Sequence, residues 1–486
     1  MPLGWMVRRS SYFDSIALMR VAEQARQVAG VTDVAAVMGT PANRAMLAEA
    51  GLSSPDTPET DAPDLLVAVR AATDDAVQGA LRRVAELLSA RRDVATGDHE
   101  RPPRTTWSAA RAAGDASLAL IAVPGPAAVV DAHQALAAGL HVFLFSDGVS
   151  LEDEVALKRR ARARGLLVMG PECGTAIVNG VGLGFANRVR RGPIGVVGAS
   201  GTGLQELTSL VDRQGAGISH AIGTGGRDLH AVVGGITTLQ ALALLGADDD
   251  TRVIVLVSKP SSPAVGDAVL GALAAMGKPV VACLLGYEGA MPAGVRGSRT
   301  LEEAAVLAVE LSGGGGGGGQ APTLRGPDAT PAVRGEIRGL YSGGTLCEEG
   351  RRLVGDRAHR FVDFGAEEYT RGRPHPIIDP GQRHAAILEA AADPSVGVLL
   401  LDLVLGDCAH PDPTGALDPV LAAAHERARS GGRELAVVAH VVGTDRDPQD
   451  VARQEEILRK RGVTVCASNR LAALTARAMA RGRDDA

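Results

Sequence analysis

The sequence predicts a multi-domain α/β protein, and three observations lead to that prediction. The chain has 486 residues, enough for three or four domains at roughly 100–200 residues each. Short apolar runs alternate with segments of helical periodicity, a pattern typical of βαβ units and parallel sheets. Two of the alternating regions begin with a strand, a Gly/Ser/Thr turn and a helix, which is how a doubly wound domain starts.

Residues 1–191 are expected to form two units. A small α/β domain is predicted at 1–105, where Thr40 caps a helix with Pro41 in its first turn. A Rossmann-like unit is predicted at 106–191. The expected strands are 33–38, 65–69, 118–123, 141–145 and 166–169, and the expected helices are 15–28, 40–50, 74–88, 127–138 and 151–164.

The remaining residues are expected to form two flavodoxin-like, doubly wound domains at 192–312 and 333–486. A linker at 313–332, which begins with seven consecutive glycines, joins them. The expected strands are 194–197, 218–222, 253–257 and 280–284 in the first, and 337–341, 360–364, 397–402, 435–440 and 463–466 in the second.

Composition excludes several function classes. Aromatic residues are only 2% and the net charge is −6 without a basic run, which argues against nucleic-acid binding. Apolar runs are too short to span a membrane, and the first nine residues lack the apolar core of a signal peptide. The five cysteines show no CxxC spacing. We therefore expect a cytoplasmic protein with no metal, no covalently bound cofactor and no nucleic-acid or membrane partner.

The two Gly/Ser/Thr turns are candidate anion sites, because a helix N-terminus presents free backbone N–H groups and a positive dipole end. We expect both helix N-termini to converge on one phosphate, with Thr202 and Thr345 in solvent-facing turns. The alternative is an ordinary tight βα turn, with Ser200 as the helix cap. The candidate phosphate-binding residues are Ser200, Gly201, Thr202, Gly203, Ser342, Gly343, Gly344 and Thr345.

Two further candidates follow strands of the first flavodoxin-like domain. Lys259, at the carboxyl end of the strand 253–257, is one of four lysines among 50 basic residues, and its charge suits a phosphate or a developing oxyanion. Gly225 and Gly226 permit close backbone approach, and Arg227 is a candidate anion ligand. The alternatives are a solvated lysine and an ordinary loop with an Arg–Asp pair.

A loop in the last domain holds a candidate catalytic histidine. His375 lies between two prolines and is a candidate general acid or base. Arg371 and Arg373 precede it and are candidate bidentate ligands for a phosphate or carboxylate. A surface histidine is the alternative. Cys173 has no local partner that would activate it, and a structural role is favoured.

The order of motifs resembles that of a known family. The segments GPECG at 170–174, GPIGVVGASGT at 192–202 and AIGTGGRD at 221–228 resemble the α subunit of succinyl-CoA synthetase. The unit from 333 onward, with FVDFG at 361–365 and LLLD at 399–402, resembles the C-terminal ligase domain of its β subunit. Over its whole length, including MGTPAN at 38–43 and GRPHP at 372–376, the chain is most similar to the FdrA family. The resemblance implies a CoA-binding-type unit at 106–191 and a phosphoryl group held between two helices.

Departures from the synthetase pattern shape the expected activity. The loop 286–290 has no histidine to be phosphorylated, and Lys259 stands near the position of its partner carboxylate. The residues between 312 and 333 cannot form an ATP-grasp region, and residues 1–50 lack the glycine fingerprint for CoA phosphates. Phosphate, or an acyl or carbamoyl phosphate, is therefore the expected substrate, and CoA binding stays an open alternative.

The FdrA resemblance implies two activities. One is a multi-subunit oxamate carbamoyltransferase of allantoin catabolism, in which phosphate cleaves carbamoyl-oxamate to oxamate and carbamoyl phosphate. We favour this reading, with the chain in a hetero-oligomer with other subunits of the pathway. An acyl-CoA synthetase subunit that uses an ATP-grasp domain of another chain is the second hypothesis. A non-catalytic scaffold or nucleotide-sensing module is the third.

Overall fold

The computed structural model describes residues 1–13, 15–93, 103–259, 262–313, 332–355, 358–370 and 373–481. The chain divides into two compact units. The first contains Met1–Arg104 and Ala366–Asp379, and the second contains Thr105–Gly365 and Pro380–Ala486. Most of the expected linker at 313–332, and Arg371 of the histidine loop, lie outside the described residues.

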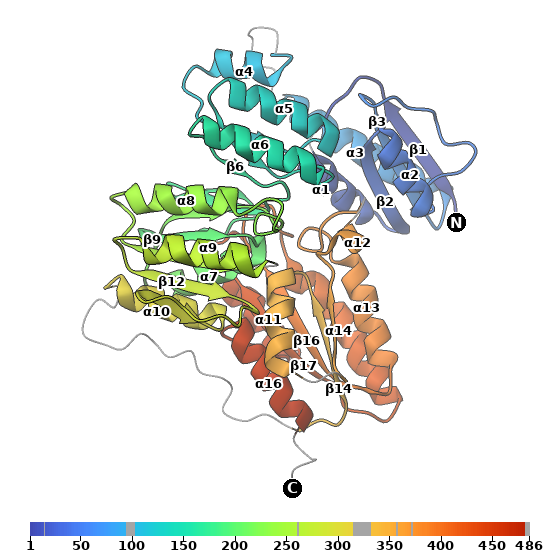
Figure 1. Ribbon diagram of the computed structural model, residues 1–486. Helices are drawn as coiled ribbons and strands as arrows, with labels where there is room; N and C mark the ends of the chain where they lie inside the picture. The colour runs from blue at the N-terminus through green and yellow to red at the C-terminus, as the bar shows by residue number, and fades with distance from the viewer. Residues whose placement is uncertain are drawn as a thin grey trace. The chain divides into compact units, whose positions relative to one another are not determined.

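The first unit contains a three-stranded antiparallel sheet in the order β1-β3-β2 (Figure 1). Thr40 caps α2 as expected, because its Oγ1 accepts a hydrogen bond from Asn43 N at 3.2 Å. The strand β1 was not predicted from the sequence. The elements are β1 (Leu3–Arg8), α1 (Ser15–Arg26), β2 (Val31–Met38), α2 (Pro41–Glu49), β3 (Leu65–Ala71), α3 (Asp74–Asp93) and, from the later segment, α12 (Glu367–Thr370).

The second unit begins with a three-stranded parallel sheet in the order β4-β5-β6. Its strands alternate with helices, as the sequence predicts. The elements are α4 (Thr106–Ala113), β4 (Leu118–Ile121), α5 (Gly125–Ala137), β5 (His141–Leu144), α6 (Leu151–Ala163) and β6 (Val168–Met169).

A seven-stranded sheet follows, in the order β13-β12-β11-β9-β10-β7-β8. Its five parallel strands run in the flavodoxin-like order, and the hairpin β7–β8 extends one edge antiparallel. That hairpin precedes residue 192, where we expected the domain to begin. The elements are β7 (Thr175–Val178), β8 (Val181–Gly184), β9 (Arg191–Gly198), α7 (Gly201–Arg213), β10 (Ile218–Gly223), α8 (Ile236–Ala247), β11 (Val253–Ser258), α9 (Pro263–Ala274), β12 (Val280–Leu284), β13 (Val295–Ser298) and α10 (Leu301–Leu311).

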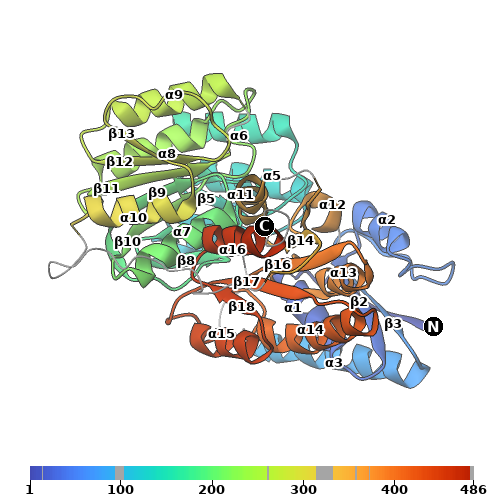
Figure 2. The ribbon, with the colours of Figure 1, turned by 90° about the horizontal axis from the view of Figure 1, so that it is seen from below.

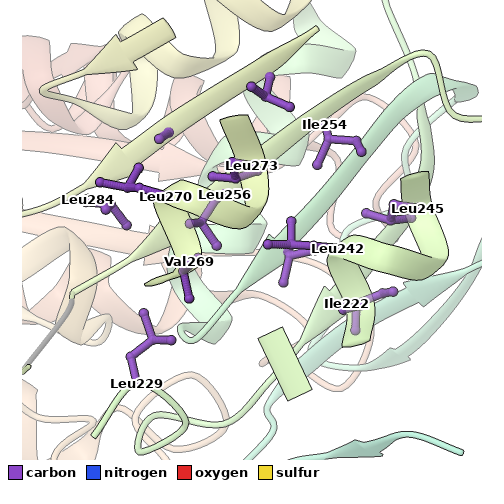
Figure 3. Packing of buried hydrophobic residues seen from close by; sticks show 14 of the residues in the cluster. Ile222, Leu229, Leu242, Leu245, Ile254, Leu256, Val269, Leu270, Leu273 and Leu284 are labelled. Atoms are coloured by element: carbon purple, nitrogen blue, oxygen red, sulfur yellow. The ribbon is translucent and has the colours of Figure 1, made fainter. Parts of the chain in front are cut away.

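The core of this sheet is built from aliphatic side chains of its strands and of α8 and α9 (Figure 3). Ile254 and Leu256 are two residues apart, so they lie on the same face of β11. They pack with Leu242 and Leu270 from the two helices. Burying each of these side chains stabilises the folded state by about 1.5–3 kcal/mol. The ends of the strands are thereby held at fixed positions.

A five-stranded parallel sheet completes the unit in the order β15-β14-β16-β17-β18, again flavodoxin-like. Helices α7 and α10 of the preceding sheet pack against α11 and α16 of this one (Figure 2). The predicted α/β fold class is confirmed. The elements are β14 (Glu336–Tyr341), α11 (Gly344–Val354), β15 (Arg360–Asp363), α13 (Gly381–Ala392), β16 (Val396–Val404), α14 (Pro413–Ser430), β17 (Ala436–Val442), α15 (Val451–Lys460), β18 (Thr464–Cys466) and α16 (Asn469–Arg481).

Candidate functional site

The two Gly/Ser/Thr turns lie at equivalent places in the two flavodoxin-like sheets. Each follows the first strand, β9 or β14, whose neighbours in the sheet are the second and third strands. This is the point at which the strand order reverses, where open α/β sheets bind ligands. Ser200 caps α7, since its Oγ accepts a hydrogen bond from Gly203 N at 3.2 Å. Gly343 takes the corresponding position before α11.

The turns meet in direct contact. Thr345 Oγ1 donates a hydrogen bond to Ser200 Oγ. A Cβ atom on Gly343 would lie 2.8 Å from Thr202 Oγ1, so glycine permits this close approach. The N-termini of α7 and α11 therefore converge as expected. The expectation of solvent-facing turns is wrong, because each turn covers the other and leaves Thr202 9% and Thr345 1% exposed.

A buried carboxylate of the protein itself occupies part of the second turn. Asp402, at the carboxyl end of β16, accepts hydrogen bonds from Ser342 N at 2.7 Å and Gly343 N at 2.8 Å. Arg383 Nη1 donates to Asp402 Oδ1 at 2.8 Å and to Ser342 Oγ at 2.7 Å. The two amides that we expected to bind a ligand thus bind Asp402 instead. Burial raises the pKa of Asp402, and the charge of Arg383 opposes that rise.

Other amides at the two helix ends have no acceptor within their own helices. The amides of Gly201, Thr202, Gly344 and Thr345 belong to the first turns of α7 and α11, where no intrahelical carbonyl can accept from them. These amides belong to the two turns that meet at the Ser200–Thr345 hydrogen bond. We name these amides, together with the hydroxyl groups of the two turns, the two-helix cradle.

Lys259 is exposed and follows β11, next to the cradle. Burial, with the carboxylates of Asp363 and Asp402, raises the pKa of the Cys347 thiol to about 12, while the charge of Lys259 acts to lower it. Cys347 lies in the second turn of α11, so Lys259 brings a positive charge to that helix. Cys347 itself is a protonated thiol at neutral pH and is a poor nucleophile.

The loop at Gly225 and Gly226 has a different role from the one we expected. Arg227 Nε binds Glu154 Oε2 at 2.9 Å and its Nη2 donates to Val149 O at 2.9 Å. The adjacent Asp228 binds the fully buried Lys158 at 2.7 Å. A Cβ on Gly225 would lie 2.5 Å from a backbone oxygen, so this loop packs tightly against the preceding parallel sheet. Arg227 and Gly225 are therefore engaged by contacts within the protein, and the role predicted for Gly226 stays a prediction.

His375 and Arg373 lie in the first unit, whereas the cradle and Lys259 lie in the second. Burial lowers the pKa of His375 to about 4, so the imidazole is neutral at pH 7. Its Nδ1 accepts a hydrogen bond from Ile377 N at 3.3 Å. In the same segment, Asp379 forms an ion pair with Arg26 of α1. The roles predicted for His375 and Arg373 stay predictions.

Two kinds of site are not found in the part of the chain that the structure describes. No cluster of three or more His, Cys, Asp or Glu side chains is arranged to hold a metal ion there. Within the same residues, no helix has the length and apolar character needed to cross a bilayer.

Three family models match the chain. They are described as "AllF, heavy metal-associated domain" at residues 1–103, "CoA binding domain" at 189–286 and "CoA-ligase" at 340–479. The residues under the first model do not fit a heavy metal, because positions 1–103 contain no cysteine and a single histidine, His99, which lies outside the described residues.

Individual proteins are also similar to the chain. "Uncharacterized protein YahF" of Escherichia coli K12 is 38% identical, over 97% of this chain and 97% of its own. The "Succinate--CoA ligase [ADP-forming] subunit alpha 1" of Archaeoglobus fulgidus is 29% identical over 44% of this chain and 76% of its own. Among solved structures, the dinucleotide-forming acetyl-coenzyme A synthetase 1 of Ca. Korarchaeum cryptofilum, in complex with phosphate and ADP, matches at 16% identity and a TM-score of 0.34 over 75% of this chain and 82% of that one.

Proposed function

The chain belongs to the succinyl-CoA synthetase-like family of acyl-CoA ligases that includes YahF, and we propose that it is an enzyme subunit that transfers an acyl or carbamoyl group to phosphate. The observation that carries the proposal is the convergence of α7 and α11 at the Ser200–Thr345 hydrogen bond. Each helix end contributes roughly half a positive charge. Asp402 offsets part of this charge at α11, and an anion between the two helix ends would offset the rest.

The cradle supplies donors to more than one oxygen of that anion. The hydroxyl groups of Ser200 and Thr345 now bond to each other, and a phosphoryl group takes the place of that bond. The first-turn amides of α7 and α11 donate to its remaining oxygens. Lys259 adds a full positive charge from the end of β11. The amides of Ser342 and Gly343 already donate to Asp402. The phosphoryl group therefore binds the next amides, those of Gly344 and Thr345 in the first turn of α11.

The reaction that we favour is phosphorolysis of an N-carbamoyl amide such as carbamoyl-oxamate. An oxygen of hydrogen phosphate attacks the carbamoyl carbon, and the bond from that carbon to the amide nitrogen breaks. The proton of hydrogen phosphate ends on the departing nitrogen, so the products are carbamoyl phosphate and oxamate. The chain holds phosphate in line for attack and stabilises the oxyanion of the tetrahedral intermediate electrostatically. We also propose that further subunits complete the substrate site.

An acyl-CoA ligase subunit is the second candidate. It is favoured by the CoA-binding and CoA-ligase models, which match residues of the two flavodoxin-like sheets. In that case the cradle receives a phosphoryl group that another chain derives from ATP, and CoA is a substrate. Calorimetric titration with CoA separates the two candidates, since micromolar binding favours the ligase.

An isotope-exchange assay tests the favoured reaction. The purified full-length protein, alone and with its co-purifying partners, is incubated with labelled inorganic phosphate, carbamoyl phosphate and oxamate. We expect label to enter carbamoyl phosphate, and Ser200→Ala to abolish most of the exchange. Thr208→Ala is the matched control, because Thr208 is also buried on α7, and its hydroxyl donates to Gln205 O of the same helix. Absence of exchange together with ATP-dependent thioester formation from CoA would support the ligase instead.

A further inference from the structure

The two helices of the cradle carry the same short pattern. Gly201-Thr202 is followed four residues after the threonine by Glu206, and Gly344-Thr345 is followed in the same way by Glu349. Residues four apart lie on one face of a helix. Each glutamate therefore lies one turn behind a threonine of the cradle, and both are buried, with 1% and 2% exposed.

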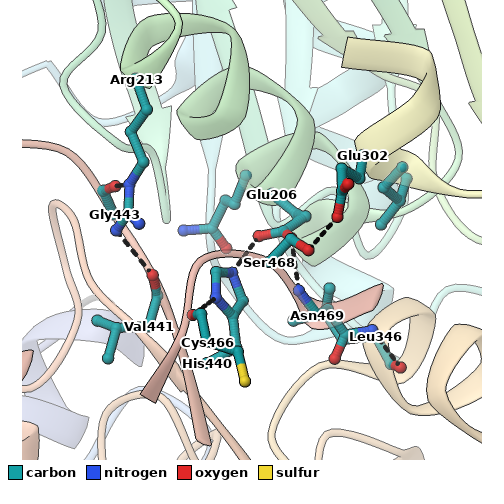
Figure 4. Close-up of polar contacts among 12 residues, drawn as sticks. Glu206, Arg213, Glu302, Leu346, His440, Val441, Gly443, Cys466, Ser468 and Asn469 are labelled. Carbon is teal, nitrogen blue, oxygen red and sulfur yellow. Dashed lines mark hydrogen bonds and ion pairs between the residues drawn. The ribbon is translucent and has the colours of Figure 1, made fainter. Parts of the chain in front are cut away.

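One residue joins the two glutamates. Asn469, the first residue of α16, donates from its backbone N to Glu206 Oε1 at 3.1 Å and from Nδ2 to Glu349 Oε2 at 2.8 Å. Its Nδ2 also donates to Leu346 O at 3.0 Å (Figure 4). Asn469 is 1% exposed, so these bonds form away from water. The residue thus bridges α7 and α11 directly behind their N-termini.

The remaining oxygens of the two carboxylates are also held. Glu206 Oε2 lies 2.7 Å from His440 Nε2, and His440 Nδ1 donates to Cys466 O at 3.0 Å. Glu349 Oε1 accepts from Leu301 N, at the start of α10, at 2.7 Å. Every carboxylate oxygen therefore has a partner, which offsets the cost of burying the two acidic groups.

We propose that Asn469 is a positioning residue that sets the spacing and axial register of α7 and α11, and through them the geometry of the anion site between Ser200 and Thr345. The proposal rests on the proposed function for its effect on phosphate. It does not depend on that function for the geometry itself. The glutamates are too far along their helices to touch the ligand, so they act only through the helices that carry them.

The chain offers a closely matched control. Asn187 is also buried, and its Nδ2 also donates to one backbone carbonyl, Leu405 O at 3.0 Å, and one carboxylate, Asp447 Oδ2 at 2.8 Å. It joins the same two sheet domains, and its Oδ1 accepts from Gln205 Nε2 of α7 at 3.2 Å, but its described bonds do not include one to α11. Asn469→Ala and Asn187→Ala therefore each remove one amide that donates to a carbonyl and to a carboxylate. Asn469→Ala keeps the backbone bond to Glu206 but removes both side-chain bonds to α11, and so it breaks the bridge at its α11 end.

Two measurements on the full chain test the proposal. In phosphate titrations, we expect Asn469→Ala to weaken binding about tenfold or more, since small misplacements of a binding group are costly, and Asn187→Ala to stay within about twofold of wild type. In the second measurement, Ser200→Cys and Thr345→Cys are combined in one chain, alone and together with each alanine substitution. Peptide mass spectrometry measures the disulfide yield under mild oxidation. We expect Asn469→Ala to lower that yield and Asn187→Ala to leave it unchanged.

The phosphate titration and the disulfide yield test two different claims. If wild type binds no phosphate, the proposed function is overturned while the disulfide yield still decides the role of Asn469. Equal effects of the two alanine variants on the disulfide yield would overturn the positioning role. Should Asn469→Ala not fold, Glu349→Gln serves in its place, because it retains the side-chain volume and an acceptor for Leu301 N while disturbing the bond to Asn469.

Discussion

Replacing Glu349 by glutamine should remove a large part of the pH dependence of stability. Burial raises the pKa of Glu349 from 4.5 to about 7. The folded protein therefore keeps a proton that the unfolded chain releases. Stability from this group is fully present below pH 4.5 and is lost as the pH rises to about 7. At 1.36 kcal/mol for each pH unit, the total loss is about 3 kcal/mol, of which about 2.5 kcal/mol falls between pH 5 and 8.

The assay is urea unfolding at pH 5 and pH 8. Hydrogen exchange of peptides from the buried strand β16 reports the opening of the protein. The two pH values bracket the titration of Glu349. The free energy of opening should fall more steeply with pH in wild type than in Glu349→Gln, by about 2.5 kcal/mol. Glu348→Gln is the control. Burial acts to raise the pKa of Glu348, but Arg351 and Arg352 lower it below its usual value, so the stability that Glu348 contributes rises with pH instead of falling. Equal pH dependence in wild type and Glu349→Gln would show that Glu349 does not titrate between pH 5 and pH 8 in the folded protein.

Two further substitutions test buried charges. Lys158→Met should destabilise the protein by about 3–5 kcal/mol in chemical unfolding, because it leaves the carboxylates of Glu154 and Asp228 buried without their shared cation; a loss below about 1 kcal/mol would contradict this. Asp402→Asn should destabilise by a similar amount, since it leaves Arg383 without its buried counter-charge. A variant that keeps the wild-type unfolding midpoint would show that this pair is not a net support of the turn.

Much of the fold could be predicted from the sequence because local patterns determine it. The apolar strands and amphipathic helices of the two flavodoxin-like sheets recur in a regular order, and glycine-rich turns mark where each sheet begins. The strands β1, β7, β8 and β13 were missed, because they are short or lie at sheet edges, and β1 also pairs with β3, a segment about 60 residues away. The turn Asn179-Gly180 between β7 and β8 was an available hairpin signal, since both residues adopt the positive φ that such a turn requires.

The site could be predicted only in part. The Ser200 and Thr345 turns could be recognised because a strand, a glycine-rich turn and a helix are contiguous in the sequence. The bonds from Asp402 to the second turn join residues about 60 apart, and no local pattern indicates them. Arg227 was predicted to bind an anion ligand. Its actual partner, Glu154, is 73 residues away, and no local pattern in the sequence indicates that pairing. The repeated Gly-Thr-x-x-x-Glu pattern was the one available signal for the buried glutamates.

Calorimetric titration of the protein with inorganic phosphate measures whether one phosphate binds between the two helix N-termini. Wild type should bind one phosphate per chain. Ser200→Ala and Thr345→Ala should each weaken that binding by roughly tenfold to a hundredfold, as expected for the loss of a hydrogen bond to a charged group worth about 1.5–3 kcal/mol, while Thr208→Ala should bind as wild type does. Failure of wild type to bind phosphate, or unchanged affinity in both cradle variants, would contradict the account.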